Sequence, residues 1–531
     1  MFVESATDSA EQLTGLLAST GAHGVLGLAI GMLAARLMHR WRLHWSWAAL
    51  ALAPVLLLRS SLTISNVMLA VAAVCAAACA RRRHRRDLEA GSEAAAHARA
   101  SSTPVDAVRA WARSHAERRG AVAGGASQLL DGGLALGRDE RGRCVRVPFG
   151  GDYGRHVLVV GATGSGKTVT QTWIAACAIE HGLGAIVVDP KGDRGMHREI
   201  QRAAGAAGRR MLTWAPGGGV VYNPYERGGE SEIADKLLAG ERFTEPHYLR
   251  QAQRYLGHVV RALRARGVQI SLQAIVEHLD PQELERLTRE LADREGQATQ
   301  AYLDSLSPRQ RGDLAGVRDR LAILAESDVG PWLDPRTPGA PRFDLLGAVR
   351  AREVVYLCLD ADSRPLIAEM LGAAIVQDLQ TTVAALQGSP VPTLVVIDEF
   401  SAVAAHQVVR LFNRARSAGF SLLLGTQELA DLRLPGRERL LEQVMGNLSV
   451  LVAHRQVVPE SAELIAEMAG TRGVWRVARH SDGGSTRTPS RERVLDRDRL
   501  MALAPGWGAV LAPGCGRHAR IARIFSPGCD R

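Results

Sequence analysis

The sequence has few lysines and no closely spaced cysteine pairs, and these absences limit the kinds of site that the chain can form. Only three of the 65 basic residues are lysines, at positions 167, 191 and 236, so arginine is the default cation. The seven cysteines lie apart and form no C-x-x-C pair, which argues against a disulfide framework and against a structural metal site. With 531 residues, of which 46% are hydrophobic, the chain can form two or three domains with buried cores.

The N-terminal region has no Lys or Arg before its first apolar run, so a cleavable signal peptide is not expected. Residues 16–35 form an uncharged run long enough to span a bilayer, and a second run covers 62–80. A shorter run at 47–58 contains Pro54, which leaves either two or three crossings open. The basic clusters at 36–42 and 81–86 favour the cytoplasmic side. We therefore expect a membrane anchor over residues 1–86, followed by a linker over 87–133 and a cytoplasmic remainder.

Residues 156–168 predict a nucleotide site. The apolar run 157–160 is typical of a buried strand, and the pattern Gly161-x-x-x-x-Gly166-Lys167-Thr168 is a complete P-loop followed by a helix. In this motif, backbone amides hold phosphates, the lysine reaches the β- and γ-phosphate oxygens, and the threonine binds Mg²⁺. The predicted nucleotide-binding residues are Gly161, Ala162, Thr163, Gly164, Ser165, Gly166, Lys167 and Thr168. The cofactors expected from this motif are ATP and Mg²⁺.

A second strand, 185–188, ends in a charged turn that contains Asp189, Lys191 and Asp193. The carboxyl ends of parallel strands meet at one edge of the sheet, so these side chains should lie beside the P-loop. A charged turn without a function is the alternative. Two of the three lysines therefore fall in βα turns, where a compact ammonium can act differently from a planar guanidinium. We interpret Lys236, on an ordinary helix, as chance.

A third strand, 394–397, ends in Asp398 and Glu399, which matches a Walker B strand. Asp398 would hold Mg²⁺ through water, and Glu399 would polarise the attacking water. Gln427 follows the strand 421–426 and could sense the γ-phosphate. The predicted catalytic residues are Lys167, Glu399 and Gln427. The candidates for an arginine finger given to a neighbouring subunit are Arg414, Arg416 and Arg455.

Amphipathic helical patterns fill residues 230–332, with helix starts at Asp280-Pro281 and Ser307-Pro308. The expected fold is α/β: a RecA-like P-loop motor domain over 134–229 and 333–531, with an all-α domain inserted at 230–332. The tail from Arg472 to Arg493 is polar and basic, which suggests a flexible loop. Residues 508–512 and 519–525 predict a closing hairpin. The net charge of +10 favours contact with a polyanion, either nucleic acid or anionic lipid.

The motifs at 161–168, 188–193, 222–225, 397–400 and 425–427, in this order, resemble the TraD/TraG-type coupling proteins of conjugation and type IV secretion, which belong to the FtsK–HerA superfamily of P-loop ATPases. The resemblance implies a homo-hexameric, multi-pass ATPase of the bacterial inner membrane with its motor in the cytoplasm. It also implies, as partners, single-stranded DNA with relaxosome proteins, or protein substrates, and the components of a type IV secretion channel.

Two other functions fit the sequence. An FtsK-like translocase of double-stranded DNA would share the P-loop and the Asp-Pro-Lys turn. A nucleotide-dependent membrane receptor or scaffold would need the P-loop but not a water-polarising Glu399, so the presence of this carboxylate argues against it.

Overall fold

The computed structural model describes the chain from residue 133 onward, except for residues 150–153, 242, 244, 290, 292–293, 404, 434–438, 480–484, 513–518 and 528–531. Before residue 133 it describes only residues 25, 78, 129 and 130, so the predicted membrane anchor and nearly all of the predicted linker lie outside the described residues. Among the helices that are described, none has both the length and the apolar character needed to cross a bilayer. The chain divides into two units after Ala123, and the fold described below belongs to the unit Gly124–Arg531.

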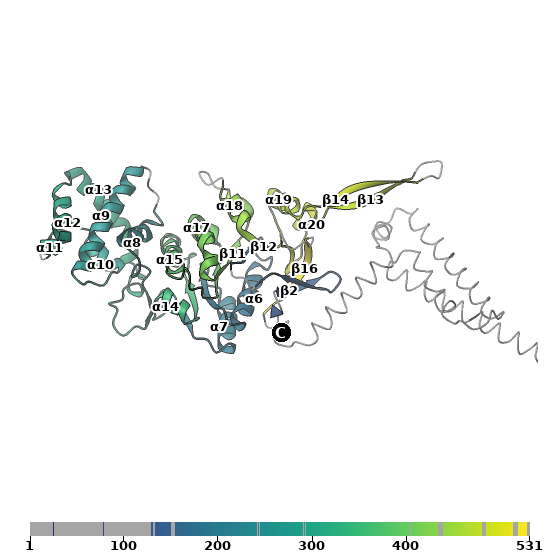
Figure 1. Ribbon diagram of the computed structural model, residues 1–531, viewed down its shortest axis with the longest axis horizontal. Coiled ribbons are helices and arrows are strands. Elements are labelled where there is room, and N and C mark those ends of the chain that lie inside the picture. The colour runs from purple at the N-terminus through teal and green to yellow at the C-terminus, as the bar shows by residue number, and fades with distance from the viewer. Residues whose placement is uncertain are drawn as a thin grey trace, which may run out of the picture. The chain divides into compact units, whose positions relative to one another are not determined.

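A sheet of twelve strands is the centre of this unit (Figure 1), in the order β1-β2-β16-β15-β12-β4-β11-β10-β5-β9-β6, with β3 beside β2. The strands from β12 to β6 in this order are parallel. They are β12 (Leu448–Ala453), β4 (His156–Val160), β11 (Phe420–Thr426), β10 (Thr393–Ile397), β5 (Gly184–Asp189), β9 (Val354–Cys358) and β6 (Met211–Trp214).

The antiparallel strands extend this sheet on the β12 side. They are β15 (Trp507–Leu511), β16 (Arg520–Ile524), β2 (Gly133–Asp139), β3 (Cys144–Val147) and β1 (Leu129–Leu130). The predicted closing hairpin is thus formed by β15 and β16, and both of its strands join the main sheet. Because β2 pairs with β16 from residue 137 onward and with β3 from residue 134, the folded unit begins before the P-loop strand by more than twenty residues.

Helices cover both faces of the parallel strands, and the residues of these strands are accordingly mostly apolar and buried. Val157 and Val159 of β4 join a core with α6 (Lys167–Glu180) and α7 (Arg194–Ala206). Leu158 and Val160 join the core on the opposite face, with α15 (Pro365–Ala385) and α17 (Ala405–Ala415). The smaller helices are α14 (Leu345–Arg350), α16 (Phe400–Val403), η3 (Arg416–Ala418), η4 (Leu429–Leu432), α18 (Leu440–Asn447), α19 (Pro459–Ala469) and α20 (Arg497–Met501).

A helical segment lies between β7 (Val221–Tyr222) and β8 (Arg342–Phe343) in the chain. These two short strands pair with each other, so the segment leaves and re-enters the sheet region at one place. It contains α8 (Glu230–Leu238), α9 (Pro246–Ala265), α10 (Leu272–Glu277), α11 (Pro281–Arg289), α12 (Arg294–Asp304), α13 (Pro308–Ala325) and η2 (Gly330–Trp332). The start of α13 is a capping box between Ser307 and Gln310, as its sequence indicates. The core of this segment is continuous with that of the sheet. The division of the chain into domains remains a prediction.

The basic tail is not a loop, which corrects the sequence-based expectation. Thr471–Arg479 and Ser485–Arg493 form strands β13 and β14, which pair with each other in a separate antiparallel ribbon. Residues 471–493 show no strand pattern in the sequence, because the alternation that marks a strand needs an apolar face and these residues are mainly polar.

Candidate nucleotide site

The P-loop connects the end of β4 to the start of α6, and its glycines occupy positions that other residues would not tolerate. Gly164 has a φ of 74° and Gly166 a φ of 109°, both in the left-handed region. A Cβ atom on Gly161 would lie 2.6 Å from His454 Cβ and 2.7 Å from Ser165 Oγ. No side chain caps the N-terminus of α6, which begins at Lys167. The loop therefore leaves the first-turn amides and the positive end of the helix dipole to an anion.

Two lysines contact one carboxylate beside this loop. The distance from Lys167 Nζ to Glu399 Oε2 is 2.7 Å, and the distance from Lys191 Nζ to the same oxygen is also 2.7 Å. Lys167 Nζ also lies 3.6 Å from Asp398 Oδ1. The Glu399 side chain is only 10% exposed, and its φ of 46° is unusual for a residue other than glycine. The structure thus places P-loop, Walker B and Asp-Pro-Lys residues in direct contact.

The surroundings of Glu399 and Asp398 shift the pKa values of these two neighbouring carboxylates in opposite directions. Burial alone would raise the pKa of Glu399, but hydrogen bonds from Lys167 and Lys191 outweigh burial and lower it. Burial raises the pKa of Asp398, although Lys167 works in the opposite direction. Glu399 is therefore held as an anion at neutral pH, in the form that can accept a proton from water.

Gln171 is a site residue that the sequence did not indicate. With its amide oriented to satisfy both neighbours, it donates to Asp398 Oδ1 at 3.0 Å and accepts from the Gly425 N–H at 3.2 Å. A Cβ atom on Gly425 would lie 2.4 Å from the side-chain amide of Gln171 and 2.5 Å from Asp398 Oδ1, so only glycine fits there. This contact joins α6 to β10 and β11 and orients the Walker B aspartate. In the sequence, the only indication of this contact is Gly425, which precedes Thr426 and Gln427.

Gln427 lies at the carboxyl end of β11 and reaches the P-loop. Thr163 Oγ1 donates to Gln427 Oε1 at 3.4 Å, a long hydrogen bond. Thr168 follows Lys167 in the first turn of α6, the position from which the hydroxyl of this motif binds Mg²⁺.

The two aspartates of the Asp-Pro-Lys turn differ from its lysine in what they contact. Asp189 accepts hydrogen bonds from the backbone N–H groups of residues 191, 192 and 193 and from the Tyr356 hydroxyl. Asp193 caps α7 by accepting from the N–H groups of Gly195 and Met196. Both carboxylates therefore hold the turn in shape, and Lys191 is the residue of this turn that reaches the site.

The three arginine candidates lie at different edges of the sheet. Arg455 follows β12, and its carbonyl accepts from the N–H of Ala162 in the P-loop at 3.0 Å. Arg416 instead lies near Gly154, where an added Cβ would be 2.4 Å from Arg416 Cβ. Gly154 precedes β4, so Arg416 is at the edge opposite the P-loop, and Arg414 lies on the adjoining end of α17. Neither can reach the nucleotide site of its own chain.

His454 connects the P-loop helix α6 to β15 by two hydrogen bonds. Its Nδ1 donates to the Trp507 carbonyl at 2.9 Å, so its Nε2 is the acceptor for the Thr170 hydroxyl at 2.8 Å. Burial lowers the pKa of His454 to about 4, which keeps the ring neutral at physiological pH. The N–H of Gly506 donates to the Ser165 carbonyl at 2.9 Å. The loop before β15 therefore also holds the P-loop in place.

Lys236 is not a chance lysine, contrary to the interpretation from sequence. Its side chain is 1% exposed and its Nζ donates to Asp378 Oδ1 of α15 at 2.7 Å, while Tyr222 donates to Asp378 Oδ2 at 2.8 Å. Lys236 also donates to the carbonyls of Pro224 and Arg227, at 2.8 Å each. This buried network joins α8 to the helix that covers the sheet. The ammonium group of each of the three lysines thus donates a hydrogen bond to a carboxylate.

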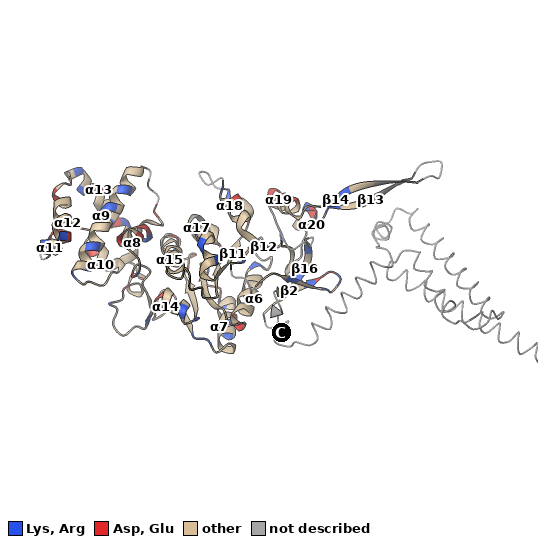
Figure 2. Cartoon of the chain, in the orientation of Figure 1, with Lys and Arg blue, Asp and Glu red and all other residues tan. Residues whose placement is uncertain are grey.

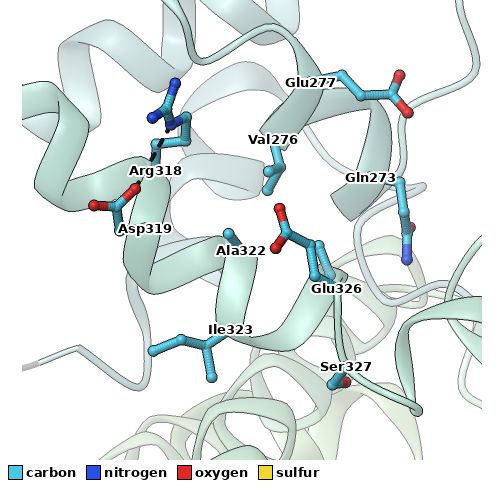
Figure 3. Close-up of a pocket in the computed structure, with 10 residues that line it drawn as sticks. Gln273, Val276, Glu277, Arg318, Asp319, Ala322, Ile323, Glu326 and Ser327 are labelled. Atoms are coloured by element: carbon cyan, nitrogen blue, oxygen red, sulfur yellow. Dashed lines mark ion pairs between the residues drawn. The ribbon is translucent and has the colours of Figure 1, made fainter.

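A separate hollow lies in the helical segment, between α10 and α13 (Figure 3), with a volume of about 780 Å³. The apolar residues that line it are Val276, Ala322, Ile323 and Ala325, and Ile323 is 47% exposed. Glu326 points toward Val276 across the hollow and forms no ion pair with any described residue. Glu277, by contrast, is paired with Arg336 at 3.0 Å. The hollow therefore offers an apolar contact beside an unpaired negative charge.

The residues present fit a Mg²⁺–nucleotide. The uncapped α6 terminus and the Lys167 ammonium suit a phosphate chain, and the oxygens of Thr168 and Asp398 suit the ligand preferences of Mg²⁺. Among the described residues, no cluster of His, Cys, Asp and Glu could hold a structural metal by itself. The fold and the site together define a P-loop NTPase with a motor domain of the RecA-like kind.

Comparisons with known proteins give the family. The model of the helicase HerA central domain matches residues 143–312, and the model of the TraM recognition site of TraD and TraG matches residues 392–505. An uncharacterized protein of Mycoplasma pneumoniae is 32% identical over 104 residues, which are 19% of this chain and 69% of that protein. The chain belongs to the FtsK–HerA superfamily of P-loop ATPases and is of the TraD/TraG type.

Solved structures share the fold. The bacterial conjugative coupling protein TrwB aligns with a TM-score of 0.54 at 17% identity, over 72% of this chain and 87% of TrwB. TrwB has also been solved with ADP and Mg²⁺, and that structure aligns with the same TM-score. VirB4 of Thermoanaerobacter pseudethanolicus aligns with a TM-score of 0.51 at 16% identity, over 75% of this chain and 97% of VirB4.

Proposed function

We propose that this chain is an ATPase that couples ATP hydrolysis to the delivery of single-stranded DNA with its relaxase, or of protein substrates, into a type IV secretion or conjugation channel. The contact of Lys167 and Lys191 with Glu399 supports hydrolysis most directly, because a carboxylate held ionised beside the phosphate loop is the group that activates water. The TraD/TraG-type family and the TrwB-like fold support the transport role.

In this reaction the bound Mg²⁺ would neutralise phosphate charge and orient the phosphates. The remaining steps belong to residues of the chain. The P-loop amides and Lys167 bind the phosphates, which draws Lys167 away from Glu399. Lys191 stays on Glu399 and keeps it ionised, and Gln171 keeps Asp398 oriented. Glu399 then accepts a proton from the attacking water.

The proposal includes a homo-hexamer in the bacterial inner membrane, with a multi-pass anchor over residues 1–86 and the motor in the cytoplasm. A hexamer fits the positions of Arg414 and Arg416, at the edge of the sheet opposite their own P-loop, because there they could serve only the site of a neighbour.

Substrate choice is proposed to lie in the helical segment, where the hollow between α10 and α13 would bind a basic segment of a protein substrate. Ile323 would supply the apolar contact and Glu326 the ion pair. We expect Ile323→Asp with Glu326→Arg to abolish substrate transfer while ATP turnover remains. The matched control is Leu366→Asp with Glu295→Arg, because Leu366 of α15 and Glu295 of α12 are an exposed aliphatic residue and an exposed acid that do not line the hollow. Normal transfer by the first variant would contradict this placement.

The transport role is tested by the substrate that remains bound to Glu399→Gln protein purified from its native cell. Relaxase-linked DNA or a secreted protein is the expected result. Cells without the chain should fail to transfer a mobile plasmid but segregate chromosomes normally. A segregation defect with normal transfer would favour the FtsK-like translocase.

A further inference from the structure

Arg364 joins the helical segment to the region of the nucleotide site. Charged residues of both signs are spread over the helices of this segment (Figure 2), so an ion pair there is common. Arg364 differs because its two partners come from different parts of the fold. It stands at the N-terminal cap of α15, and its guanidinium contacts Asp328, which follows α13, and Asp360, which follows β9.

On the side of the helical segment, Asp328 belongs to the loop that borders the hollow. It directly follows Ser327, which lines the hollow. The carbonyl of Ser327 accepts from the N–H of Gly330 at 3.0 Å, and the carbonyl of Gly330 accepts from Gln273 in the hollow wall at 2.6 Å. Arg364 donates to Asp328 through Nε at 3.3 Å and through a terminal nitrogen at 2.6 Å. A ligand that enters the hollow therefore meets residues that are fastened to the loop held by Arg364.

On the side of the sheet, Arg364 fixes the turn after β9. It donates to Asp360 Oδ2 at 2.5 Å, and Asp360 has a φ of 53°, which is unusual for a residue other than glycine. The next residue, Ala361, donates its N–H to the carbonyl of Pro190 at 2.7 Å. Pro190 is the residue before the lysine that contacts the Walker B glutamate. Hydrogen bonds and adjacent residues thus connect the loop beside the hollow to the catalytic carboxylate.

Two other polar contacts between the helical segment and the sheet region end away from the nucleotide site. Lys236 reaches Asp378 in α15, and Trp214 of β6 donates to the carbonyl of Trp332 at 3.1 Å. Within the described part of the chain, neither Asp378 nor Trp214 forms a hydrogen bond or ion pair with the P-loop or with Glu399. Of these three contacts, the one made by Arg364 is the one that leads to the nucleotide site.

We propose that Arg364 is a positioning residue that couples the hollow to ATP hydrolysis by setting the position of Lys191 on Glu399. Phosphate binding draws Lys167 away and leaves Lys191 as the cation on this carboxylate, so the turn that carries Lys191 is held more firmly. Arg364 passes this restraint to the loop beside the hollow. Coupling between two sites is reciprocal in binding free energy, so a substrate segment in the hollow favours the nucleotide-bound arrangement. The inference rests on the proposed function, because it takes the hollow as the substrate site of that function.

The test is hydrogen exchange of the full chain in detergent, with and without Mg²⁺ and a non-hydrolysable ATP analogue. Coupled sites typically change each other's affinity by about fivefold or more, so nucleotide should slow exchange of residues 328–333 in the wild type at least about fivefold. Arg364→Gln should lose this slowing. Its nucleotide affinity should stay within about twofold of the wild type, because the partners of Arg364 lie outside the P-loop. Arg364→Lys, which keeps the positive charge, should restore part of the slowing.

The matched control is Arg336→Gln. Arg336 pairs with Glu277, in the wall of the hollow, and with Asp334, and both partners belong to the helical segment. The control should show the wild-type slowing, and both Gln variants should melt near the wild-type temperature because exposed ion pairs add little stability.

Three results would each overturn the proposal: no slowing in wild-type protein that has nucleotide bound, full slowing in Arg364→Gln, or an equal loss in the control. Nucleotide affinity and ATP turnover of the wild type, measured on the same samples, test the proposed function separately. A wild type that binds and hydrolyses ATP without slower exchange of residues 328–333 would therefore refute the coupling alone.

Discussion

Replacing Lys191 tests whether the Asp-Pro-Lys turn takes part in catalysis. Lys191 donates to Glu399 Oε2 at 2.7 Å, and it is the cation left on this carboxylate when phosphates engage Lys167. A hydrogen bond to a charged group contributes about 1.5–3 kcal/mol, and the lower value applies here because the Lys191 side chain is 40% exposed. About 1.5 kcal/mol corresponds to roughly tenfold in rate. We therefore expect Lys191→Gln to lower kcat about tenfold.

The assay is steady-state ATP turnover at saturating ATP, with nucleotide affinity measured separately. The affinity should change little, because the P-loop is intact. Loss of a cation raises the pKa of Glu399, so the acid limb of the kcat profile should move to higher pH. The control is Arg194→Gln, which removes an exposed positive charge three residues along the chain without touching Glu399. Wild-type kcat for Lys191→Gln, or an equal loss in the control, would refute this role.

Three further predictions concern stability. Lys236→Met should destabilise the fold by about 3–5 kcal/mol because Asp378 stays buried without its cation, and adding Asp378→Asn should restore part of the melting temperature; no drop would contradict the network. The pKa of His454 is about 4 when folded and about 6.5 when unfolded, so its contribution is complete above pH 6.5 and falls as the pH drops toward 4. Between pH 7 and pH 5, thermal melts should show a loss about 2 kcal/mol larger for the wild type than for His454→Gln, and equal losses would contradict the neutral ring. A fragment starting at residue 124 should be soluble and folded, whereas one starting at Gly137 should aggregate because β2 is cut; equal solubility would show that β2 is dispensable.

The sequence predicted those parts of the fold whose signals are local. Apolar runs such as 157–160 and 394–397 could only be strands buried on both faces, and the P-loop motif fixed the strand before it and the helix after it. Contacts between distant elements carry no such signal. Gln171 and Lys236 are polar residues on helices, and only their neighbours across the sheet, Asp398 and Asp378, give them a function.

The ribbon shows a second reason for failure. The apolar residues of β13 stand in adjacent pairs, Val474-Trp475 and Val477-Ala478, and do not alternate with polar residues, so the sequence resembled a loop. The sequence also could not give the order of strands in the sheet, in which β12 and β11 flank the P-loop strand β4.

The most direct test of the account is ATP turnover by the Glu399→Gln protein, measured together with nucleotide retention. The variant should retain ATP in the presence of Mg²⁺ but hydrolyse it at least about 100-fold more slowly, because only water activation is lost. Lys167→Ala, by contrast, should neither retain nor hydrolyse ATP, since it loses the charge that binds phosphate. Hydrolysis by Glu399→Gln at the wild-type rate would contradict the assignment of the catalytic carboxylate.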